Sequence, residues 1–240
     1  MRLILSGGPR GERAKESYNL FAKSVGDKKV MYIPLAWEKY SYEKCLTDYF
    51  LLLIEPYGIL DVDLITDANQ ITCERLKQVG GVYFGGRNVF KLLKLLKESC
   101  AYENLKDFAL KNDTVVMGGS AGALIWGKSI ETCKDDGLGL QSICDENKVG
   151  LIDCSGFDML KGFSLLVHYK KLPEQNELTE KRIQRLINEG YKLICLPEEA
   201  SIVVEDNKIY SIGAEIEIIT KSRREKIKPK QAINLQDNLV

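Results

Sequence analysis

Short hydrophobic runs of β-forming residues alternate with helix-like segments through the first half of the chain. The strand-like runs are 3–5, 29–34, 59–64, 81–84 and 114–117, and the helix-like segments are 14–24, 40–54, 73–78, 89–99 and 102–111. Strands that alternate with helices form right-handed βαβ units, in which helices cover both faces of a parallel sheet. This pattern predicts an α/β fold, a three-layer sandwich with a mostly parallel central sheet flanked by helices.

The second half of the chain has a different pattern. Polar stretches at 134–139 and 145–148 indicate loops, and strand-like runs then return at 151–153, 162–167, 192–196, 201–205, 208–212 and 215–220, with a helical segment at 178–189. Closely spaced short strands predict extra, antiparallel strands in the C-terminal part. We find no Pro- or Ser-rich linker, so we expect one domain over 1–240, and we expect the basic and polar residues 221–240 to form a solvated tail.

Charge and apolar run length exclude two classes of partner. Lys plus Arg equals Asp plus Glu at 34 each, so no overall field draws the chain to nucleic acid or to an anionic membrane. No apolar run approaches the length that spans a membrane, and the first residues lack the apolar region of a signal peptide. We therefore expect a cytoplasmic protein without a nucleic-acid or membrane partner.

The cysteines indicate a reduced protein. The 7 cysteines are scattered along the chain, and no two of them form a C-x-x-C pair. This spacing argues against both a disulfide framework and a zinc site. We expect neither a metal nor a cofactor.

The strongest chemical signal is a glycine-flanked serine. Residues 114–126 read Thr-Val-Val-Met-Gly-Gly-Ser-Ala-Gly-Ala-Leu-Ile-Trp, and Gly118, Ser120 and Gly122 fit G-x-S-x-G. This motif places a serine on a strained strand-to-helix turn with its hydroxyl exposed, and small neighbours are needed because the backbone there is tight. The stretch predicts a nucleophilic serine at the end of a buried strand.

The same residues also match a phosphate-binding loop. Gly122 to Ser129 fits G-x-x-x-x-G-K-[ST], with Lys128 and Ser129 as the phosphate and magnesium ligands. A phosphate loop needs its strand to end just before the first glycine and an open loop of converging N–H groups. Here the strand-like run ends near Met117, and the apolar residues 123–126 suit the first turns of a buried helix. A P-loop nucleotide-binding protein is the alternative.

A serine nucleophile needs a base and an acid that orients the base. The chain has one histidine, His168, which follows the strand-like run 162–167. The acid can come from two groups: Asp135, Asp136, Asp145 and Asp153 lie between serine and histidine, and Glu198 and Glu199 follow the histidine. Placement at the end of a strand favours Glu198. The loop 85–88, Gly-Gly-Arg-Asn, follows another strand and can supply backbone N–H donors to an oxyanion.

These residues resemble a known family. The likeness covers most of the chain and rests on Leu-Ile-Leu-Ser-Gly-Gly at 3–8, Phe-Gly-Gly-Arg-Asn-Val-Phe-Lys-Leu-Leu at 84–93, Met-Gly-Gly-Ser-Ala-Gly-Ala at 117–123, His168, and Leu-Pro-Glu-Glu-Ala-Ser-Ile-Val-Val at 196–204. They resemble the serine peptidases that include dipeptidase E (alpha-aspartyl dipeptidase) and cyanophycinase. That family shares the flavodoxin-like fold of class I glutamine amidotransferases.

The resemblance implies a role for each matching residue. Ser120 would be the nucleophile, His168 the general base and acid, and Glu198 the acid of the triad. The backbone N–H groups of Gly86 and Ala121 would form the oxyanion hole. An aspartate in the loop after the nucleophile is also considered important in this family, so Asp135 and Asp136 stay alternatives for the acid, as does Glu199.

Two departures from the family pattern bear on substrate specificity. Arg87 stands between the second glycine and Asn88, and Val167 replaces a proline often found before the histidine. Relatives that cut after an N-terminal aspartate need a cation for that side chain. The candidates for substrate binding are Arg87, Asn88, Lys170, Lys171 and Arg182.

We therefore expect a serine exopeptidase that hydrolyses short peptides through an acyl-enzyme. Besides the P-loop protein, two alternatives on the same fold stay open, which are an esterase or amidase with the same triad and a non-catalytic binding relative.

Overall fold

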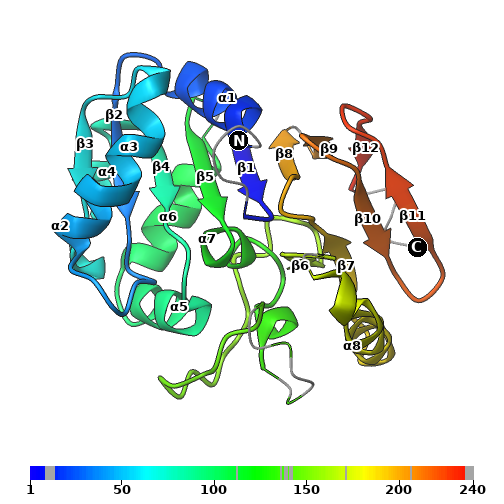
Figure 1. The fold of residues 1–240 in the computed structure, drawn as a ribbon. Helices are drawn as coiled ribbons and strands as arrows, with labels where there is room; N and C mark the ends of the chain where they lie inside the picture. Colours follow the sequence, from blue (N-terminus) through cyan, green and yellow to red (C-terminus); the bar gives the residue numbers. More distant parts are fainter. Residues whose placement is uncertain are drawn as a thin grey trace.

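The computed structural model describes residues 1–8, 14–111, 113–135, 137, 140, 143–170, 172–205 and 207–235. Their strands form an 8-stranded sheet, in the order β12-β9-β8-β1-β5-β4-β2-β3, and a 4-stranded sheet, in the order β11-β10-β7-β6. Figure 1 shows the large sheet running across the molecule and the small sheet beside the strands β8, β9 and β12 of the large sheet.

The large sheet has a parallel part and an antiparallel part. Five adjacent strands run parallel to one another: β3 (Val62–Leu64), β2 (Lys29–Ile33), β4 (Val79–Phe84), β5 (Val115–Gly119) and β1 (Arg2–Ser6). On the other side of β1 the sheet continues with three antiparallel strands, β8 (Ser201–Glu205), β9 (Lys208–Ile212) and β12 (Ile233–Asn234). The predicted parallel core with later antiparallel strands is confirmed.

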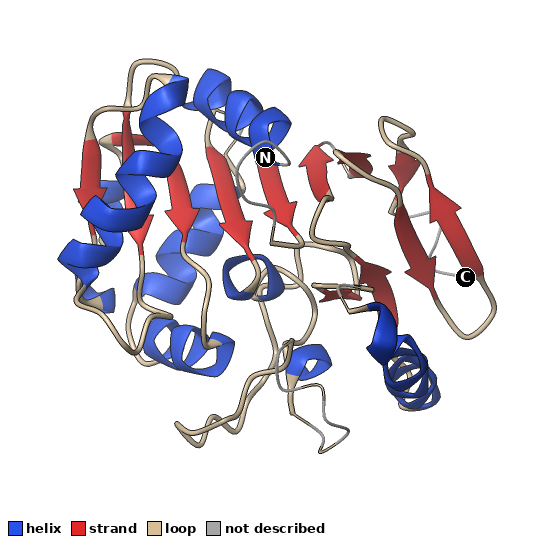
Figure 2. Ribbon diagram, viewed as in Figure 1, coloured by secondary structure: helices blue, strands red, loops and turns tan. Residues whose placement is uncertain are grey.

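Helices cover both faces of the parallel part (Figure 2). One face carries α1 (Lys15–Val25) and a helical segment made of α2 (Tyr42–Cys45), the π-helical turn η2 (Leu46–Phe50) and α3 (Leu51–Ile54). The other face carries α4 (Cys73–Leu76), α5 (Val89–Lys97), α6 (Ala101–Ala109) and α7 (Ala121–Leu124). Short 3-10 turns lie at η3 (Glu55–Tyr57), η4 (Ala68–Gln70), η5 (Glu131–Cys133) and η6 (Pro173–Gln175).

Alternation along the strands assigns side chains to the two cores. In β1, Leu3 and Leu5 pack in the core under α5 and α6, while Ile4 packs in the core under α1. Successive side chains of a strand point to opposite faces, so a strand buried on both faces is a continuous hydrophobic run. This is why the short run at 3–5 suffices to mark a central strand.

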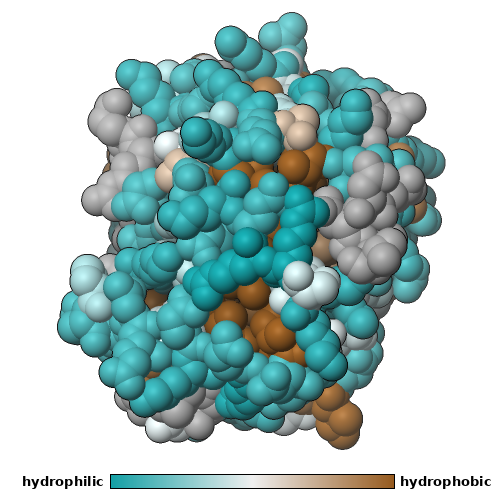
Figure 3. Space-filling view, turned by 90° about the vertical axis from the view of Figure 1, so that its right-hand side faces the viewer, coloured by the Kyte–Doolittle hydropathy of each residue, from teal (hydrophilic) through white to brown (hydrophobic). Residues whose placement is uncertain are grey.

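The small sheet carries the histidine segment. Its strands are β6 (Phe163–Leu166), β7 (Lys192–Cys195), β10 (Ile216–Ile219) and β11 (Arg224–Ile227), and α8 (Asn176–Asn188) packs on it. The outer face on this side of the molecule is mostly hydrophilic, with hydrophobic residues visible in small areas (Figure 3). None of the helices in the described ranges combines the length and the apolar character needed to span a bilayer.

Two sequence predictions about the second half are wrong. The predicted strand at 151–153 is loop, and Ile152 is exposed. Residues 221–235 are not a solvated tail, since β11 pairs with β10 and β12 pairs with β9. The charges that suggested a tail have partners, because Arg224 pairs with Glu217 and Lys226 with Glu215. The last five residues of the predicted tail, 236–240, lie outside the described residues.

Candidate active site

Ser120 occupies a sharp turn between β5 and α7. Its backbone has φ 53° and ψ −116°, a positive-φ conformation that residues other than glycine rarely adopt. The turn is held on both sides, because the Ser120 N–H donates to the Ser6 carbonyl at 3.1 Å and the Leu124 N–H donates to the Ser120 carbonyl at 3.0 Å. The strained turn that G-x-S-x-G predicts is therefore present.

The two flanking glycines are required by close packing. A Cβ on Gly118 would lie 2.1 Å from the Gly122 carbonyl oxygen, and a Cβ on Gly122 would lie 2.6 Å from the Phe84 Cβ. Real Cβ atoms do not come this close to neighbours. The glycines let α7 start directly against the ends of β5 and β4. This close packing fixes the orientation of the Ser120 residue between them.

The P-loop interpretation of residues 122–129 is wrong. Gly122 lies inside α7 instead of opening a loop, and Leu124, Ile125 and Trp126 are buried in the core. The segment then returns along β6, where the Lys128 N–H donates to the Phe163 carbonyl at 2.8 Å. An open loop with converging N–H groups does not fit this backbone.

His168 lies at the carboxyl end of β6, facing the serine turn. Its Nε2 is 2.9 Å from the Ser120 Oγ. The His168 N–H donates to the Gly7 carbonyl at 3.3 Å, and its ring lies against Gly8, where a Cβ would be 2.7 Å from Cε1. Gly7 and Gly8, directly after β1, thus form a surface against which the imidazole packs.

Glu198 is the carboxylate that contacts the other ring nitrogen. Its Oε1 is 2.9 Å from the His168 Nδ1. An ionised carboxylate can only accept a hydrogen bond, so this contact places the proton on Nδ1 and leaves the Nε2 lone pair facing the serine hydroxyl. The side chains of His168 and Glu198 are 16% and 23% exposed, so the pair is mostly shielded but reachable by water. This arrangement can accept a proton from Ser120.

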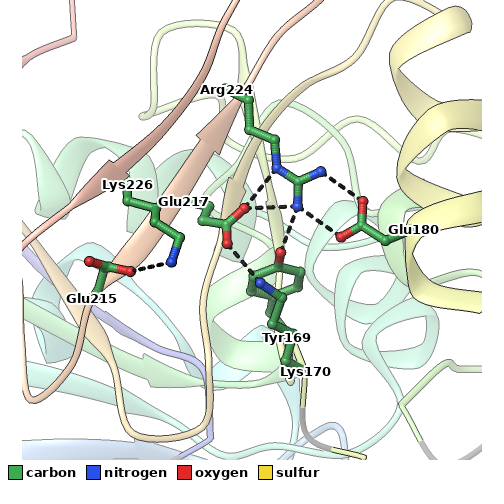
Figure 4. Close-up of polar contacts among 7 residues, drawn as sticks. All are labelled: Tyr169, Lys170, Glu180, Glu215, Glu217, Arg224 and Lys226. Atoms are coloured by element: carbon green, nitrogen blue, oxygen red, sulfur yellow. Dashed lines mark hydrogen bonds and ion pairs between the residues drawn. The ribbon is translucent and has the colours of Figure 1, made fainter. Parts of the chain in front are cut away.

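A charged cluster anchors the residues that follow His168 (Figure 4). Lys170 donates to Glu217 Oε1 at 2.8 Å, and the Tyr169 hydroxyl accepts from Arg224 at 3.0 Å. Arg224 also donates to Glu217 and to Glu180 of α8. Burial raises the pKa of Glu217, but the hydrogen bonds from Lys170 and Arg224 outweigh it and leave the pKa below its usual value. The cluster ties the His168 segment to β10, β11 and α8.

A cavity of about 480 Å³ opens beside Ser120. Ser120 and His168 line it, together with backbone of Gly86 and Gly119. Its other lining residues are mainly aromatic or apolar: Gly8, Tyr18, Tyr32, Trp37, Tyr49, Phe50, Leu53, Tyr83, Gly85, Arg87, Leu124, Cys133, Ile143, Cys144, Asp145 and Val167. The volume is in the range of small-molecule sites.

The loop predicted to supply oxyanion donors lies next to the serine. A Cβ built on Gly86 would be 3.5 Å from the Gly119 carbonyl oxygen and 3.6 Å from the Ser120 Cβ, so the Gly86 backbone is beside the nucleophile candidate. Ala121 is the first residue of α7, where N–H groups have no carbonyl of their own helix to bind. The arrangement brings both predicted donors to the serine turn.

The predicted substrate-binding residues divide into two groups. Arg87 lines the cavity, and its guanidinium lies 4.5 Å from the centre of the Trp37 ring. Asn88, Lys170 and Arg182 are outside the set of described residues that line the cavity. Asn88 caps α5 by accepting from the Lys91 N–H, and Arg182 is buried beneath the loop at Lys134 and Cys144, to which it donates hydrogen bonds. Lys171 lies outside the described residues.

Two of the alternative acids, Asp135 and Glu199, lie in other surroundings. Asp135 accepts from the Gly137 N–H at 3.0 Å, and Glu199 is exposed and lines a different cavity with Lys15 and Tyr210. Asp136 lies outside the described residues. The carboxylate found at hydrogen-bond distance from the imidazole is that of Glu198.

Sequence reasoning did not assign Asp145 or the aromatic residues to the cavity. Asp145 accepts from the Val89 N–H at 2.9 Å, and burial raises the pKa of its carboxyl despite that hydrogen bond. In the sequence Asp145 is one of the four aspartates between the serine and the histidine that are candidates for the orienting acid, and nothing in the pattern distinguishes it from the other three. The concentration of Trp and Tyr around residues 32–50 was the available signal for the aromatic wall, but no motif connects it to the serine.

Replacing Gly8 with alanine is expected to displace the imidazole of His168 from Ser120 and to lower the reactivity of the Ser120 hydroxyl by about 10²-fold or more, because a small misplacement of a base is costly. Gly26→Ala is the matched control. Gly26 also has a positive φ, 63°, but a Cβ there meets nothing within 4 Å. Both variants carry backbone strain of about 1 kcal/mol. Equal rates of labelling of Ser120 by a serine-directed fluorophosphonate in the two variants would contradict the contact between Gly8 and the imidazole.

Comparison with known proteins places these features in a family. The model of peptidase family S51 matches residues 3–212. Among curated proteins, the chain is similar to peptidase E of Shewanella sp. (strain W3-18-1), with 26% identity over 193 residues, covering 77% of this chain and 74% of that protein.

Solved structures show the same fold. The structure of a peptidase from an acI-B1 actinobacterium matches with a TM-score of 0.71 at 15% identity, covering 97% of this chain and 96% of the other. A protein solved as a candidate peptidase E from Listeria monocytogenes EGD-e matches with a TM-score of 0.65 at 22% identity, covering 88% of this chain and 98% of the other. The expected class of fold is therefore confirmed.

Proposed function

The chain belongs to peptidase family S51, and from that premise we propose that it is a serine exopeptidase that hydrolyses short peptides. The observation that carries this proposal is the pair of 2.9 Å contacts that link the hydroxyl of Ser120, the imidazole of His168 and the carboxylate of Glu198. A hydroxyl, a base and an orienting acid in this order are the parts of a serine nucleophile.

The first half of the reaction forms an acyl-enzyme. Ser120 Oγ attacks the carbonyl carbon of the scissile bond while His168 Nε2 takes the hydroxyl proton. Glu198 holds Nδ1–H and stabilises the imidazolium that forms. The N–H groups of Gly86 and Ala121 stabilise the oxyanion, and His168 then gives the proton to the leaving amine.

The second half repeats these steps with water. His168 takes a proton from a water molecule, the resulting hydroxide attacks the acyl-enzyme ester, and the proton passes to Ser120 Oγ as the acid product leaves. The partial exposure of His168 and Glu198 supports access of water to the imidazole.

The size and charge of the cavity support action on short peptides with a free amino terminus. A volume of about 480 Å³ suits a ligand of a few residues. Asp145 supplies a carboxyl to the lining. An ionised carboxylate in a partly apolar cavity attracts an ammonium group more strongly than one in water. We assign Asp145 to the α-ammonium group of the substrate.

Hydrolysis of matched peptides tests the exopeptidase assignment. The free dipeptide and tripeptide should be cleaved, with the terminal residue released first from the tripeptide, and the N-acetylated forms should be cleaved at least about 10-fold more slowly. Cleavage of a simple acyl ester without cleavage of any peptide would instead indicate an esterase. Equal rates on free and acetylated peptides would contradict the exopeptidase assignment.

Asp145→Asn is expected to raise KM for free dipeptides by about 10-fold with a smaller change in kcat, because the ion pair with the substrate is lost in both ground and transition states. Burial raises the pKa of Asp145, so wild-type Asp145 becomes protonated at a higher pH than an exposed aspartate does. The KM difference between variant and wild type should therefore shrink as the pH falls.

Thermal unfolding controls for the fold of this variant. Because the pKa of Asp145 is raised in the folded state, the contribution of this carboxyl to the free energy of unfolding is fully present at low pH. It is lost as the pH rises through the folded-state pKa. Asp145→Asn should then unfold at or above the wild-type temperature at neutral pH.

A KM difference between Asp145→Asn and wild type that persists unchanged at low pH would contradict the assignment of Asp145 to the α-ammonium group.

A further inference from the structure

We propose that the cavity beside Ser120 is a subsite for a bulky, uncharged aromatic side chain of the peptide, next to the scissile bond. This inference rests on the proposed function and adds to it the class of substrate. It is carried by the composition and geometry of the cavity wall.

Aromatic rings from separate parts of the chain form this wall. Tyr18 comes from α1, Tyr32 from β2, Phe50 from η2 and Tyr83 from β4, and all four line the cavity. The Tyr32 and Phe50 rings stack with centroids 4.1 Å apart, and the Phe50 and Tyr83 centroids are 4.7 Å apart. These rings are at most 9% exposed, so they are held in place by packing. A rigid aromatic wall favours a flat apolar ligand by stacked and edge contacts.

The mouth of the cavity is also lined by aromatic side chains. Trp37 and Tyr49 line it, with ring centroids 5.2 Å apart, and Tyr49 is 43% exposed. Tyr49 and Phe50 are the last two residues of the π-helical turn η2. Such turns are rare and occur frequently at functional sites, where they change the direction of side chains. The helical irregularity here gives the cavity two consecutive aromatic residues.

The charges of the cavity disfavour an acidic side chain. Among its described lining residues other than His168, the charged side chains are Arg87 and Asp145. The Arg87 guanidinium lies over the Trp37 ring, and Asp145 carries the opposite charge when ionised. A carboxylate placed against the aromatic wall would lose its water, which is costly, and the cation among the described lining residues, Arg87, is already held over the Trp37 ring. An aromatic ring loses little on leaving water and gains contacts.

Matched dipeptides test the subsite. In sets with Phe, Tyr, Ala or Asp at each position, the best Phe or Tyr dipeptide should show kcat/KM about 10-fold or more above its Ala counterpart, and the Asp dipeptide should fall below Ala. Higher kcat/KM for Asp than for Phe and Tyr would overturn the subsite and leave the peptidase assignment standing.

Binding to the Ser120→Ala variant separates the two proposals. Calorimetric titration of this variant with Phe-containing and Ala-containing dipeptides should give tighter binding of the aromatic one by about 10-fold. Tighter aromatic binding without hydrolysis by the wild type would sustain the subsite and contradict the proposed function. Equal binding of both dipeptides would overturn the subsite.

A variant pair tests whether the wall is responsible. Tyr49→Ala removes a half-exposed aromatic ring that lines the mouth of the cavity, and should lower kcat/KM for the aromatic dipeptide about 5-fold more than for the Ala dipeptide. Leu52→Ala, in α3 of the same helical segment, removes a more exposed side chain (68%) that is not among the described lining residues, and should change neither rate. Equal losses on both substrates in Tyr49→Ala would contradict a role in side-chain selection.

Discussion

Ser120→Ala is expected to lower kcat for peptide hydrolysis by at least about 10⁴-fold, since in the proposed mechanism the acyl-enzyme forms on the Ser120 hydroxyl. His168→Ala should lose a similar factor, because the hydroxyl is a poor nucleophile without the base 2.9 Å away. Initial rates on a short peptide, with active protein verified by thermal unfolding, measure both effects.

The double variant provides the control for this prediction. Groups that act as one unit give strongly non-additive losses, so Ser120→Ala combined with His168→Ala should be little worse than either alone. Lys128→Ala should retain wild-type rates. Lys128 belongs to the segment 122–129 that matches the P-loop pattern, and it is exposed. Full activity in His168→Ala would contradict the mechanism even if Ser120→Ala were inactive.

Glu198→Gln is expected to lower kcat by about 10³- to 10⁴-fold. A glutamine can donate as well as accept at the position of the carboxylate, so the imidazole can adopt the tautomer with its proton on Nε2, facing Ser120. The negative charge that stabilises the imidazolium is lost as well. The decrease should therefore appear in kcat, with KM little changed.

Glu199→Gln is the matched control for this prediction. Glu199 is the neighbouring residue of the same type, but it is exposed and lines a different cavity. It should retain activity within about 3-fold of wild type, the size of ordinary surface effects. Similar losses in both variants would contradict the assignment of the acid to Glu198.

The fold was predictable from sequence where the signal is local. The strands that form the parallel core are short hydrophobic runs bounded by helices and turns, and the Ser120 turn is defined by two glycines within five residues. A clash between neighbouring backbone segments explains those glycines. Such steric requirements act over a few residues, so they are visible in one sequence.

The meeting of Ser120, His168 and Glu198 is a long-range feature that sequence could anticipate in part. The chain has a single histidine, and the carboxyl ends of strands gather at one edge of a sheet, so strand-end placement pointed to His168 and Glu198. The contacts depend on the packing of Gly7 and Gly8 against these segments. That packing is not expressed as a motif.

Features that depend on pairing between distant segments were missed. The charges of Arg224 and Lys226 suggested a solvated tail, but Arg224 pairs with Glu217 on the neighbouring strand β10, and Lys226 pairs with Glu215, directly before that strand. The aromatic wall likewise combines α1, β2, η2 and β4, which no local pattern connects. Burial and charge pairing between distant segments decide such cases, and both arise only in the folded chain.

Covalent labelling tests most directly whether Ser120 is a nucleophile activated by His168. Wild-type protein treated with a fluorophosphonate should gain one adduct, located on Ser120 by peptide mass spectrometry, and His168→Ala should label at least about 10²-fold more slowly. No adduct on the wild type, an adduct on another residue, or equal labelling rates in His168→Ala would contradict the account.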